Sequence, residues 1–370
     1  MQQRDVRFDK LKIAAMLGIV WIHCVAHCNI LEKVSYLSAS YFLISIMYTI
    51  GFSMTNVFVI VSSYLLINRY KRRAGTIRFK KVYAMIALTM VYATLIYLAL
   101  VAFNVIPFSW FDFLKSVFSV FVNQYWFVGA YLFLYIVSPL LFKALDSLSE
   151  KELRILCVIE LLFFSIFPTA FIFESVIHFY DAQHGKSIIW MLVIFTLTFY
   201  IDKYGMTFID RIKKSQVLIG MFATVLLLVF SRVVLRYISY LINLGGDGEG
   251  RLFFDESFLI LIVSFGLFFL TLKERNRTAR GKSSNLFANI SNTTLGVYLV
   301  HNNPYLRGVL WSSVSPIVFA YPGVEIIMAV AVVWVVFTLC ALLELIRISV
   351  SRKISGWKLR GRLYDGTSKS

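Results

Sequence analysis

Charge is scarce in this chain. Only 15% of its residues are Asp, Glu, Lys or Arg, whereas soluble domains average about 25%. Hydrophobic residues make up 59% and the mean hydropathy is +0.75, so a soluble fold of 370 residues would have too little polar surface to cover them. The composition therefore excludes an ordinary soluble enzyme and predicts an integral membrane protein.

Cysteine is scarce as well, with four residues in 370, which excludes a disulfide-rich framework. Cys24 and Cys28 stand beside His23 and His27, a pattern that suggests a metal site. Adjacent residues on one hydrophobic helix point to different faces, however. We therefore predict no metal site and interpret the cysteines as small core residues.

Long apolar stretches dominate what is present. A helix needs about 20 apolar residues to cross a bilayer, and the sequence contains ten stretches near that length. They cover residues 11–30, 44–67, 82–106, 125–143, 153–173, 187–201, 216–238, 253–272, 290–313 and 324–348. These stretches predict an all-α, polytopic membrane helix bundle over residues 1–350, followed by a short basic cytoplasmic tail over residues 351–370.

Basic residues alternate from one predicted loop to the next. The N-terminus, the loops after the second, fourth, sixth and eighth helices, and the C-terminus hold 30 of the 37 Lys and Arg residues. Because cytoplasmic segments carry such an excess, both termini are predicted to be cytoplasmic in a multi-pass protein of the plasma or inner membrane. The net charge of +17 is attributed to topology and to contact with membrane lipids rather than with nucleic acid.

Ionisable side chains inside a span are costly and therefore mark candidate functional sites. Lys12 lies at the predicted cytoplasmic boundary of the first helix, and His23 follows eleven residues later on the same face, about 16 Å deeper. His27 continues that face by one turn. Two histidines aligned with a basic entrance favour a functional site over a merely satisfied core histidine.

The ninth predicted helix supplies two more candidates. Tyr298 and His301 are three residues apart and therefore neighbours on one helix face. A role in the reaction and simple hydrogen bonding between helices explain this pair equally well.

Seven basic residues gather between residues 69 and 81, among them Arg78 and Lys81. The cluster sets topology, and at a helix mouth it would also attract a multiply phosphorylated cytosolic ligand such as coenzyme A. Both interpretations stay open.

Two features lie near the outer side. Tyr125 and Trp126 open the fourth predicted helix, where an aromatic belt at the interface is the simpler interpretation. Arg232 and Arg236 lie one turn apart near the outer end of the seventh helix. They either extend to the outer headgroups or line an outward-facing cleft for a polar or anionic acceptor. The glycine-rich acidic segment 245–250 is predicted to be a mobile outer loop.

Four segments in sequence order resemble acyltransferase family 3, a family of membrane O-acyltransferases with about ten helices. The segments are residues 7–23, with a basic residue eleven positions before a histidine; 59–66, VIVSSYLL; 125–141, YWF followed by YIVSPLL; and 291–301, SNTTLGVYLVH. Each motif is short, but the four occur in the family's order, and the resemblance extends from about residue 7 to 348.

The resemblance implies transfer of an acetyl or other short acyl group from acetyl-CoA to a hydroxyl of a cell-surface or exported glycan or a lipid-linked sugar. No permanently bound cofactor is implied. By position, His23 is the family's histidine, the general base or transient acyl carrier. Tyr298 and His301 are the candidates for orienting it.

The cytoplasmic entrance departs from the family pattern. Lys12 replaces a more usual arginine, which keeps the charge but loses the bidentate fork. Lys12, Arg78 and Lys81 are expected to bind acetyl-CoA, whereas Trp126 and the arginine pair of the seventh helix are expected to bind the acceptor.

Two rival functions remain. A transporter or flippase of a lipid-linked glycan would also place histidines and basic residues at mid-membrane, but the inverted repeats typical of such proteins are not evident. A glycan polymerase would share the outer arginines without needing a cytoplasmic cofactor entrance.

Overall fold

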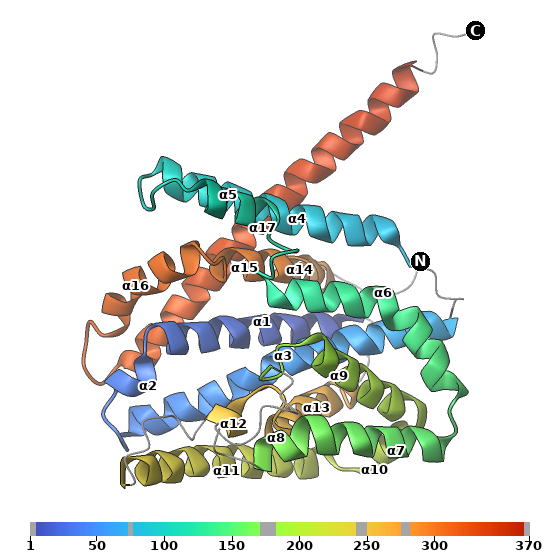
Figure 1. The fold of residues 1–370 in the computed structure, drawn as a ribbon, viewed down its shortest axis with the longest axis vertical. Coiled ribbons are helices and arrows are strands. Elements are labelled where there is room, and N and C mark those ends of the chain that lie inside the picture. Colours follow the sequence, from blue (N-terminus) through green and yellow to red (C-terminus); the bar gives the residue numbers. More distant parts are fainter. Residues whose placement is uncertain (1–4, 73–76, 171–182, 242–249, 275–281, 366–370) are drawn as a thin grey trace.

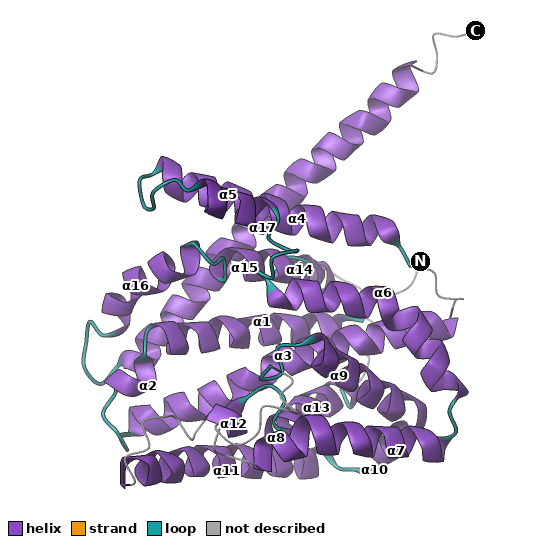
Figure 2. Cartoon of the chain, viewed as in Figure 1, coloured by secondary structure: helices purple, strands orange, loops and turns teal. Residues whose placement is uncertain are grey.

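The computed structural model describes residues 5–72, 77–170, 183–241, 250–274 and 282–365, and every regular element in these ranges is helical (Figures 1 and 2). The elements in chain order are α1 (Val6–His27), α2 (Ile30–Lys33), α3 (Ala39–Arg72), α4 (Phe79–Ala102), α5 (Trp110–Val117), α6 (Trp126–Ser147), α7 (Glu150–Leu161), the π-helical turn η1 (Leu162–Ile166), α8 (Phe167–Ala170), α9 (Ile188–Tyr200), the π-helical turn η2 (Ile201–Gly205), α10 (Met206–Arg211), α11 (Lys214–Leu241), α12 (Gly250–Phe253), α13 (Phe258–Leu272), α14 (Lys282–Ser291), α15 (Thr294–His301), α16 (Leu306–Val318) and α17 (Glu325–Asp365).

Seven helical segments of the described chain are long and apolar enough to cross a membrane. They are Ala39–Arg72, Phe79–Ala102, Trp126–Ser147, Glu150–Ala170, Ile188–Arg211, Lys214–Ile238 and Glu325–Lys353. Each falls on one of the ten predicted stretches, and α13 is a shorter apolar helix on an eighth. The protein is a multi-pass membrane helix bundle, while the count of ten crossings stays a prediction.

Helices α1 and α3 form the centre of the bundle (Figure 1). Both are surrounded by other helices: α3 packs against α9, α11 and α13, and α1 packs against α14, α15 and α17. Gly51 lets α1 and α3 approach closely, since a Cβ there would lie 2.4 Å from Ile22 Cγ2. Small residues at helix crossings serve this purpose in membranes, where packing rather than the hydrophobic effect joins helices.

One end of the bundle, which we call the basic end, gathers the first turn of α1 and the last turns of α3, α6, α10 and α13. Four polar contacts tie these segments together: Arg7 to the carbonyl of Leu272, Lys71 to Asp202, Lys203 to Asp146, and Lys273 to the carbonyl of Asp210. All of these segments belong to the set that is rich in Lys and Arg and is therefore predicted to lie on the cytoplasmic side of the membrane. The side of the membrane that this end faces stays a prediction.

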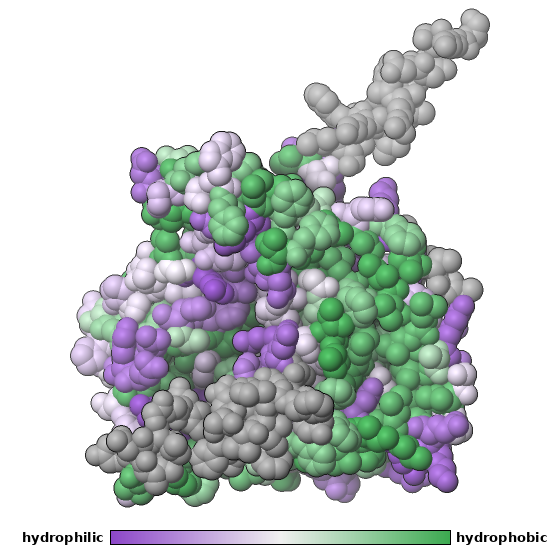
Figure 3. Space-filling view, viewed as in Figure 1, coloured by the Kyte–Doolittle hydropathy of each residue, from purple (hydrophilic) through white to green (hydrophobic). Residues whose placement is uncertain are grey.

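The other end, which we call the opposite end, carries the short helices α2, α5 and α16 (Figure 1). Lys33 of α2 contacts Ser315 of α16 there. Figure 3 shows hydrophobic residues over much of the right half of the visible face, with polar residues gathered toward α5 and α16. Exposed side chains along the spans are apolar, for example Leu95, Ile219 and Leu339, as expected where lipid is the solvent.

The predicted ninth helix, 290–313, is wrong as a single helix. Helix α15 ends at His301 and α16 begins at Leu306. Pro304 disfavours helical backbone at the residue before it, and Asn303 Oδ1 accepts hydrogen bonds from the backbone N–H groups of Tyr305 and Leu306. The side chain of Asn303 therefore starts a new helix in place of continuing the old one.

The predicted sixth helix, 187–201, is too short. The helical segment continues through the π-helical turn η2 and α10 to Arg211. Helix α17 runs without a break from Glu325 to Asp365, so the predicted tail, residues 351–370, begins within this helix. The predicted outer loop 245–250 lies outside the described residues except for Gly250, and so does the end of the fifth predicted helix, 171–173.

The orientation of the bundle is tested by cysteine labelling. All four native cysteines are buried, so a single introduced cysteine gives the signal. Ser313 of α16 and Lys151 of α7 are exposed at the opposite and basic ends. We expect an impermeant maleimide to label Ser313→Cys in intact cells and Lys151→Cys only after permeabilisation, because the basic end should be cytoplasmic. The reverse pattern would contradict the predicted orientation.

Candidate functional site

Two histidines from distant parts of the sequence meet inside the bundle. His23 projects from α1, and His301 is the last residue of α15. His23 Nδ1 and His301 Nε2 are 2.9 Å apart, which is a hydrogen bond. His301 is fully buried, while His23 is half-buried.

The backbone determines which nitrogens carry protons. His301 Nδ1 lies 2.5 Å from the carbonyl oxygen of Val297, which only accepts hydrogen bonds. Nδ1 of His301 must therefore donate, and Nε2 of the neutral ring is an acceptor. His23 then donates from Nδ1, which leaves its own Nε2 with a free lone pair.

A cavity of about 670 Å³ lies beside His23. Its lining runs along α1 from Met16 past His23 and His27, and reaches Glu32 and Arg236 toward the opposite end. The volume falls within the range of about 300–1,000 Å³ for small-molecule sites. Tyr298 lines the cavity one turn from His301, and its buried hydroxyl has no hydrogen-bond partner among the described residues.

Trp126 and the arginine pair also line this cavity. Arg232 is 4% exposed, with its guanidinium 4.0 Å from the ring centroid of Phe253 and 5.2 Å from that of Tyr48. Contact with lipid headgroups does not fit a side chain so enclosed, whereas a role in binding the acceptor stays a prediction. Arg236 is half-buried and lies 5.3 Å from the ring of Tyr36.

The aromatic-belt interpretation is wrong for Tyr125. This residue is fully buried, and its hydroxyl donates to the carbonyl of Leu299 and accepts from Asn303 Nδ2. Tyr125 therefore anchors the start of α6 against α15, and Trp126 follows at the cavity wall.

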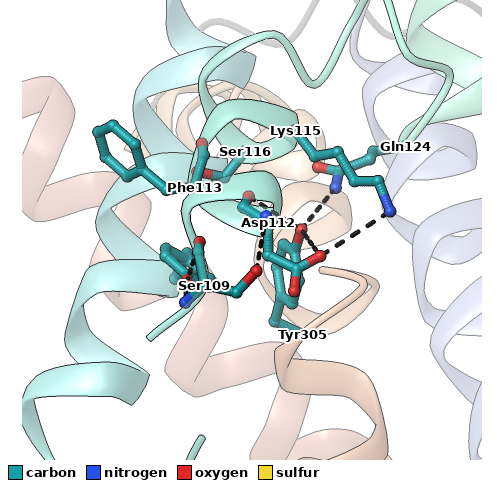
Figure 4. A network of polar contacts seen from close by, with 8 residues as sticks. Ser109, Asp112, Phe113, Lys115, Ser116, Gln124 and Tyr305 are labelled. Atoms are coloured by element: carbon teal, nitrogen blue, oxygen red, sulfur yellow. Dashed lines mark hydrogen bonds and ion pairs between the residues drawn. The ribbon is translucent and has the colours of Figure 1, made fainter. Parts of the chain in front are cut away.

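Gln124, directly before these aromatics, is held by the network in Figure 4. Its Nε2 donates to the hydroxyl of Tyr305, which in turn contacts Asp112 of α5. The amide oxygen of Gln124 is buried and has no hydrogen-bond partner among the described residues. Because Gln124 lines the cavity, this oxygen is available to accept a hydrogen bond from a ligand.

A second wall comes from the turn before α9 and the turn before α13. Asn56 of α3 donates to the carbonyl of Asp255 and accepts from the indole N–H of Trp190. The backbone N–H of Gly185 donates to the carboxylate of Glu256. These bonds fix the loops that bring Lys186, His184 and Asp255 to the cavity.

The predicted donor residues do not line this cavity. Lys12 is half-buried on α1. It lies four residues, or about one helical turn, before Met16, the first residue of that helix to line the cavity. Arg78 is exposed before α4, and the Lys81 ammonium lies 5.0 Å from the ring centroid of Tyr135. Lys12, Arg78 and Lys81 are therefore separated from His23, unlike the predicted acceptor residues.

Helix α15 is held in place by a buried carboxylate. Glu344 of α17 is 2% exposed and accepts from Tyr92 of α4 and, bidentately, from Arg347. It reaches α15 at Gly296, where a Cβ would lie 2.6 Å from the carboxyl carbon of Glu344. The glycine therefore allows the charged group to pack against the helix that presents His301.

Several of these residues were not predicted. Glu344 stands inside a predicted span, where an ionisable residue is a signal in itself. Thirty of the 37 Lys and Arg residues lie in the segments predicted to be cytoplasmic, which we call the basic segments. Lys186 and Arg307 are among the seven that lie elsewhere, as are Arg232 and Arg236. Asp255, like Glu344, stands inside a predicted span, 253–272, and carries the same signal. Gln124 carries no signal in the sequence, because loop geometry alone brings it to the cavity.

The fold and the site define a multi-pass membrane protein that presents a histidine with a free nitrogen to an internal cavity, an arrangement suited to general-base or nucleophilic catalysis. A family model described as Acyltransferase domain matches residues 5–345, nearly the whole chain, and the chain belongs to this family, acyltransferase family 3. It is thus a membrane acyltransferase. Neither the curated proteins nor the solved structures contain a match to the chain.

The packing of Glu344 on α15 is tested by Gly296→Ala. The added methyl group would overlap Glu344, so the variant should lose about 1–3 kcal/mol of stability and shift the helix that carries His301. Thermal unfolding in detergent measures the loss. Gly308→Ala on α16 is the matched control, since a Cβ there meets nothing within 4 Å. Equal unfolding temperatures for the two variants would refute the proposed contact.

Proposed function

We propose that this protein is an O-acetyltransferase that moves an acetyl or other short acyl group from acetyl-CoA to a hydroxyl of a cell-surface or exported glycan. The observation that carries the proposal is the hydrogen bond from His23 Nδ1 to His301 Nε2. It fixes the tautomer of His23 and presents the basic Nε2 for chemistry beside the cavity.

The donor is proposed to approach from the basic end. Lys12, with Arg78 and Lys81 further out, supplies positive charge for the phosphates of acetyl-CoA. Arg69 adds to this entrance, because its guanidinium donates to the hydroxyl of Tyr135, over which Lys81 lies. About 16 Å of helix α1 separates Lys12 from His23, a distance that an extended acyl-carrying arm must cover.

The acceptor is proposed to occupy the cavity from the opposite end. Aromatic rings such as Trp126 and Phe127 suit the apolar face of a sugar. Gln124 Oε1 accepts a hydrogen bond from a sugar hydroxyl, and Tyr298 Oη donates or accepts one.

Two routes use the same nitrogen. In direct transfer, His23 Nε2 removes the proton of the acceptor hydroxyl as its oxygen attacks the thioester carbonyl carbon. The C–S bond then breaks, and the coenzyme A thiolate takes the proton from His23. In the covalent route, Nε2 itself attacks the carbonyl carbon, and the C–S bond breaks to release the thiolate. The acceptor oxygen then attacks the same carbonyl carbon, the bond from that carbon to Nε2 breaks, and the hydroxyl proton passes to the thiolate.

His301 is a positioning residue in both routes. It accepts the Nδ1 proton of His23 in a hydrogen bond and stabilises the positive charge that forms on His23 when Nε2 takes a proton. Without this partner the ring of His23 would be free to rotate and to change tautomer.

The central test replaces His23. Membranes that contain His23→Ala should transfer at least about 100-fold less label from radiolabelled acetyl-CoA to glycan, because the base is lost. Cys24→Ala is the matched control, since Cys24 is buried next to His23 and does not line the cavity. If folded His23→Ala transferred as much label to glycan as the unaltered protein, the proposed mechanism would be refuted. Absence of label in glycan with the unaltered protein would favour a transporter or a polymerase.

The role of His301 gives a sharper test. His301→Ala should lower kcat by about 100-fold with little change in the KM for acceptor, because His301 does not line the cavity. His301→Gln should restore part of kcat, since its amide oxygen can accept the Nδ1 proton of His23. A change confined to KM, or no difference between the two variants, would contradict the positioning role.

A further inference from the structure

We infer that the acceptor carries a negatively charged group, a carboxylate or a phosphate, held by Lys186, Arg236 and Arg307 at the end of the cavity away from the basic end. This inference rests on the proposed function, in which the cavity holds the acceptor.

The charge of the cavity wall is the first observation. Four cationic side chains line it, from Lys186, Arg232, Arg236 and Arg307, against two carboxylates, from Glu32 and Asp255. A cleft lined mainly by one sign of charge concentrates ligands of the other sign. The excess is cationic, although the predicted orientation places this end outside the cytoplasm, where basic residues are few.

The second observation is where these cations come from. They belong to three separate stretches: Lys186 precedes α9, Arg232 and Arg236 lie on α11, and Arg307 lies on α16. Only seven basic residues of the chain lie outside the basic segments, and four of those seven line this one cavity. Topology alone does not explain such a concentration.

The third observation is proximity to the reaction centre. Lys186 and Arg307 line the same cavity as His23 and His27. Among the described residues, no ion pair engages Lys186, Arg236 or Arg307. Their charges therefore face the cavity that His23 also lines, where Asp255 offsets part of the charge of Lys186.

The geometry of the walls limits what the anion is attached to. Arg232 is enclosed by the rings of Tyr48 and Phe253, and further rings from Phe52, Phe254 and Trp126 line the same cavity. Arginine binds carboxylate and phosphate with paired N–H donors, and aromatic rings pack against a sugar. The combination fits an acidic sugar or a phosphorylated one better than a neutral glycan.

A neutral acceptor would receive hydrogen bonds from these cations through its hydroxyls. It would lack the ionic attraction that makes a charge-assisted hydrogen bond to carboxylate or phosphate roughly twice as strong. The three side chains are thus expected to set specificity and not to take part in acyl transfer itself.

Binding to the purified protein in detergent tests the inference directly. Three probes of one size are compared: cellobiose, cellobiouronic acid and cellobiose 6′-phosphate. Binding is followed by tryptophan fluorescence, since Trp126 lines the cavity. We expect at least one acidic probe to bind about tenfold more tightly than cellobiose. The order of the two acidic probes tells a carboxylate ligand from a phosphate ligand.

Neutral variants identify the side chains. Arg307→Gln, Lys186→Gln and Arg236→Gln should each weaken binding of the acidic probe several-fold and leave cellobiose unchanged. Lys33→Gln is the matched control, a cation of the same end that does not line the cavity. His23→Ala should keep the preference, because its loss affects chemistry and not the charge of the wall.

The inference is overturned if neither acidic probe binds more tightly than cellobiose, or if the three variants weaken neutral and acidic probes alike. Failure of the proposed function has a different signature. In that case no label passes from acetyl-CoA to any glycan, whichever probe the cavity prefers.

Discussion

The hydrogen bond between His23 and His301 joins the first helix of the protein to one of its last, and the site depends on it. Inside a bilayer no water replaces a lost partner, so a buried polar side chain is stabilised by binding another side chain or the backbone. His301 satisfies this requirement with the carbonyl of Val297 on one side and His23 on the other. The same requirement explains Glu344, which binds Tyr92 and Arg347 while packing on Gly296. Both sets of contacts fix α15 relative to its neighbours.

Much of the fold is predictable from apolar length and from the placement of basic residues. Seven of the ten predicted stretches coincide with long apolar helices, and the basic segments meet at one end. The errors arise where a few residues decide the backbone. Asn303 and Pro304 end one helix and begin another inside a stretch that remains apolar on average. The π-helical turn η2 extends a helix beyond the apolar stretch from which its length was predicted. Hydropathy averaged over a span does not detect either feature.

The site is predictable only in part, for a related reason. His23, His301 and the arginine pair were found because charge or basicity inside a span is rare. Tyr298 and His301 were equal candidates for orienting His23, and the sequence could not choose between them, since His23 and His301 are 278 residues apart. The prediction for Tyr125 was wrong because the sequence pattern of an aromatic residue at a helix start is the same in two cases. The ring either faces lipid or anchors a neighbouring helix. Gln124 is an ordinary loop residue until the fold places it at the cavity.

The two ends of the protein suggest how one membrane domain can serve two substrates. The cavity reaches His23 but stops one helical turn short of Lys12 along α1. In the proposed reaction the glycan therefore never needs to enter the basic end, and the phosphates of the coenzyme never need to leave it. Only the uncharged acyl-carrying arm must extend along the short segment of α1 between Met16 and His23, where apolar side chains such as Ile19 and Ile22 line the cavity. An uncharged acyl group crosses such a segment at little cost, whereas phosphates or an acidic sugar would lose their hydration there. The separation of charge along α1 is thus a physical basis for keeping the two polar substrates apart while their reactive groups meet at one histidine.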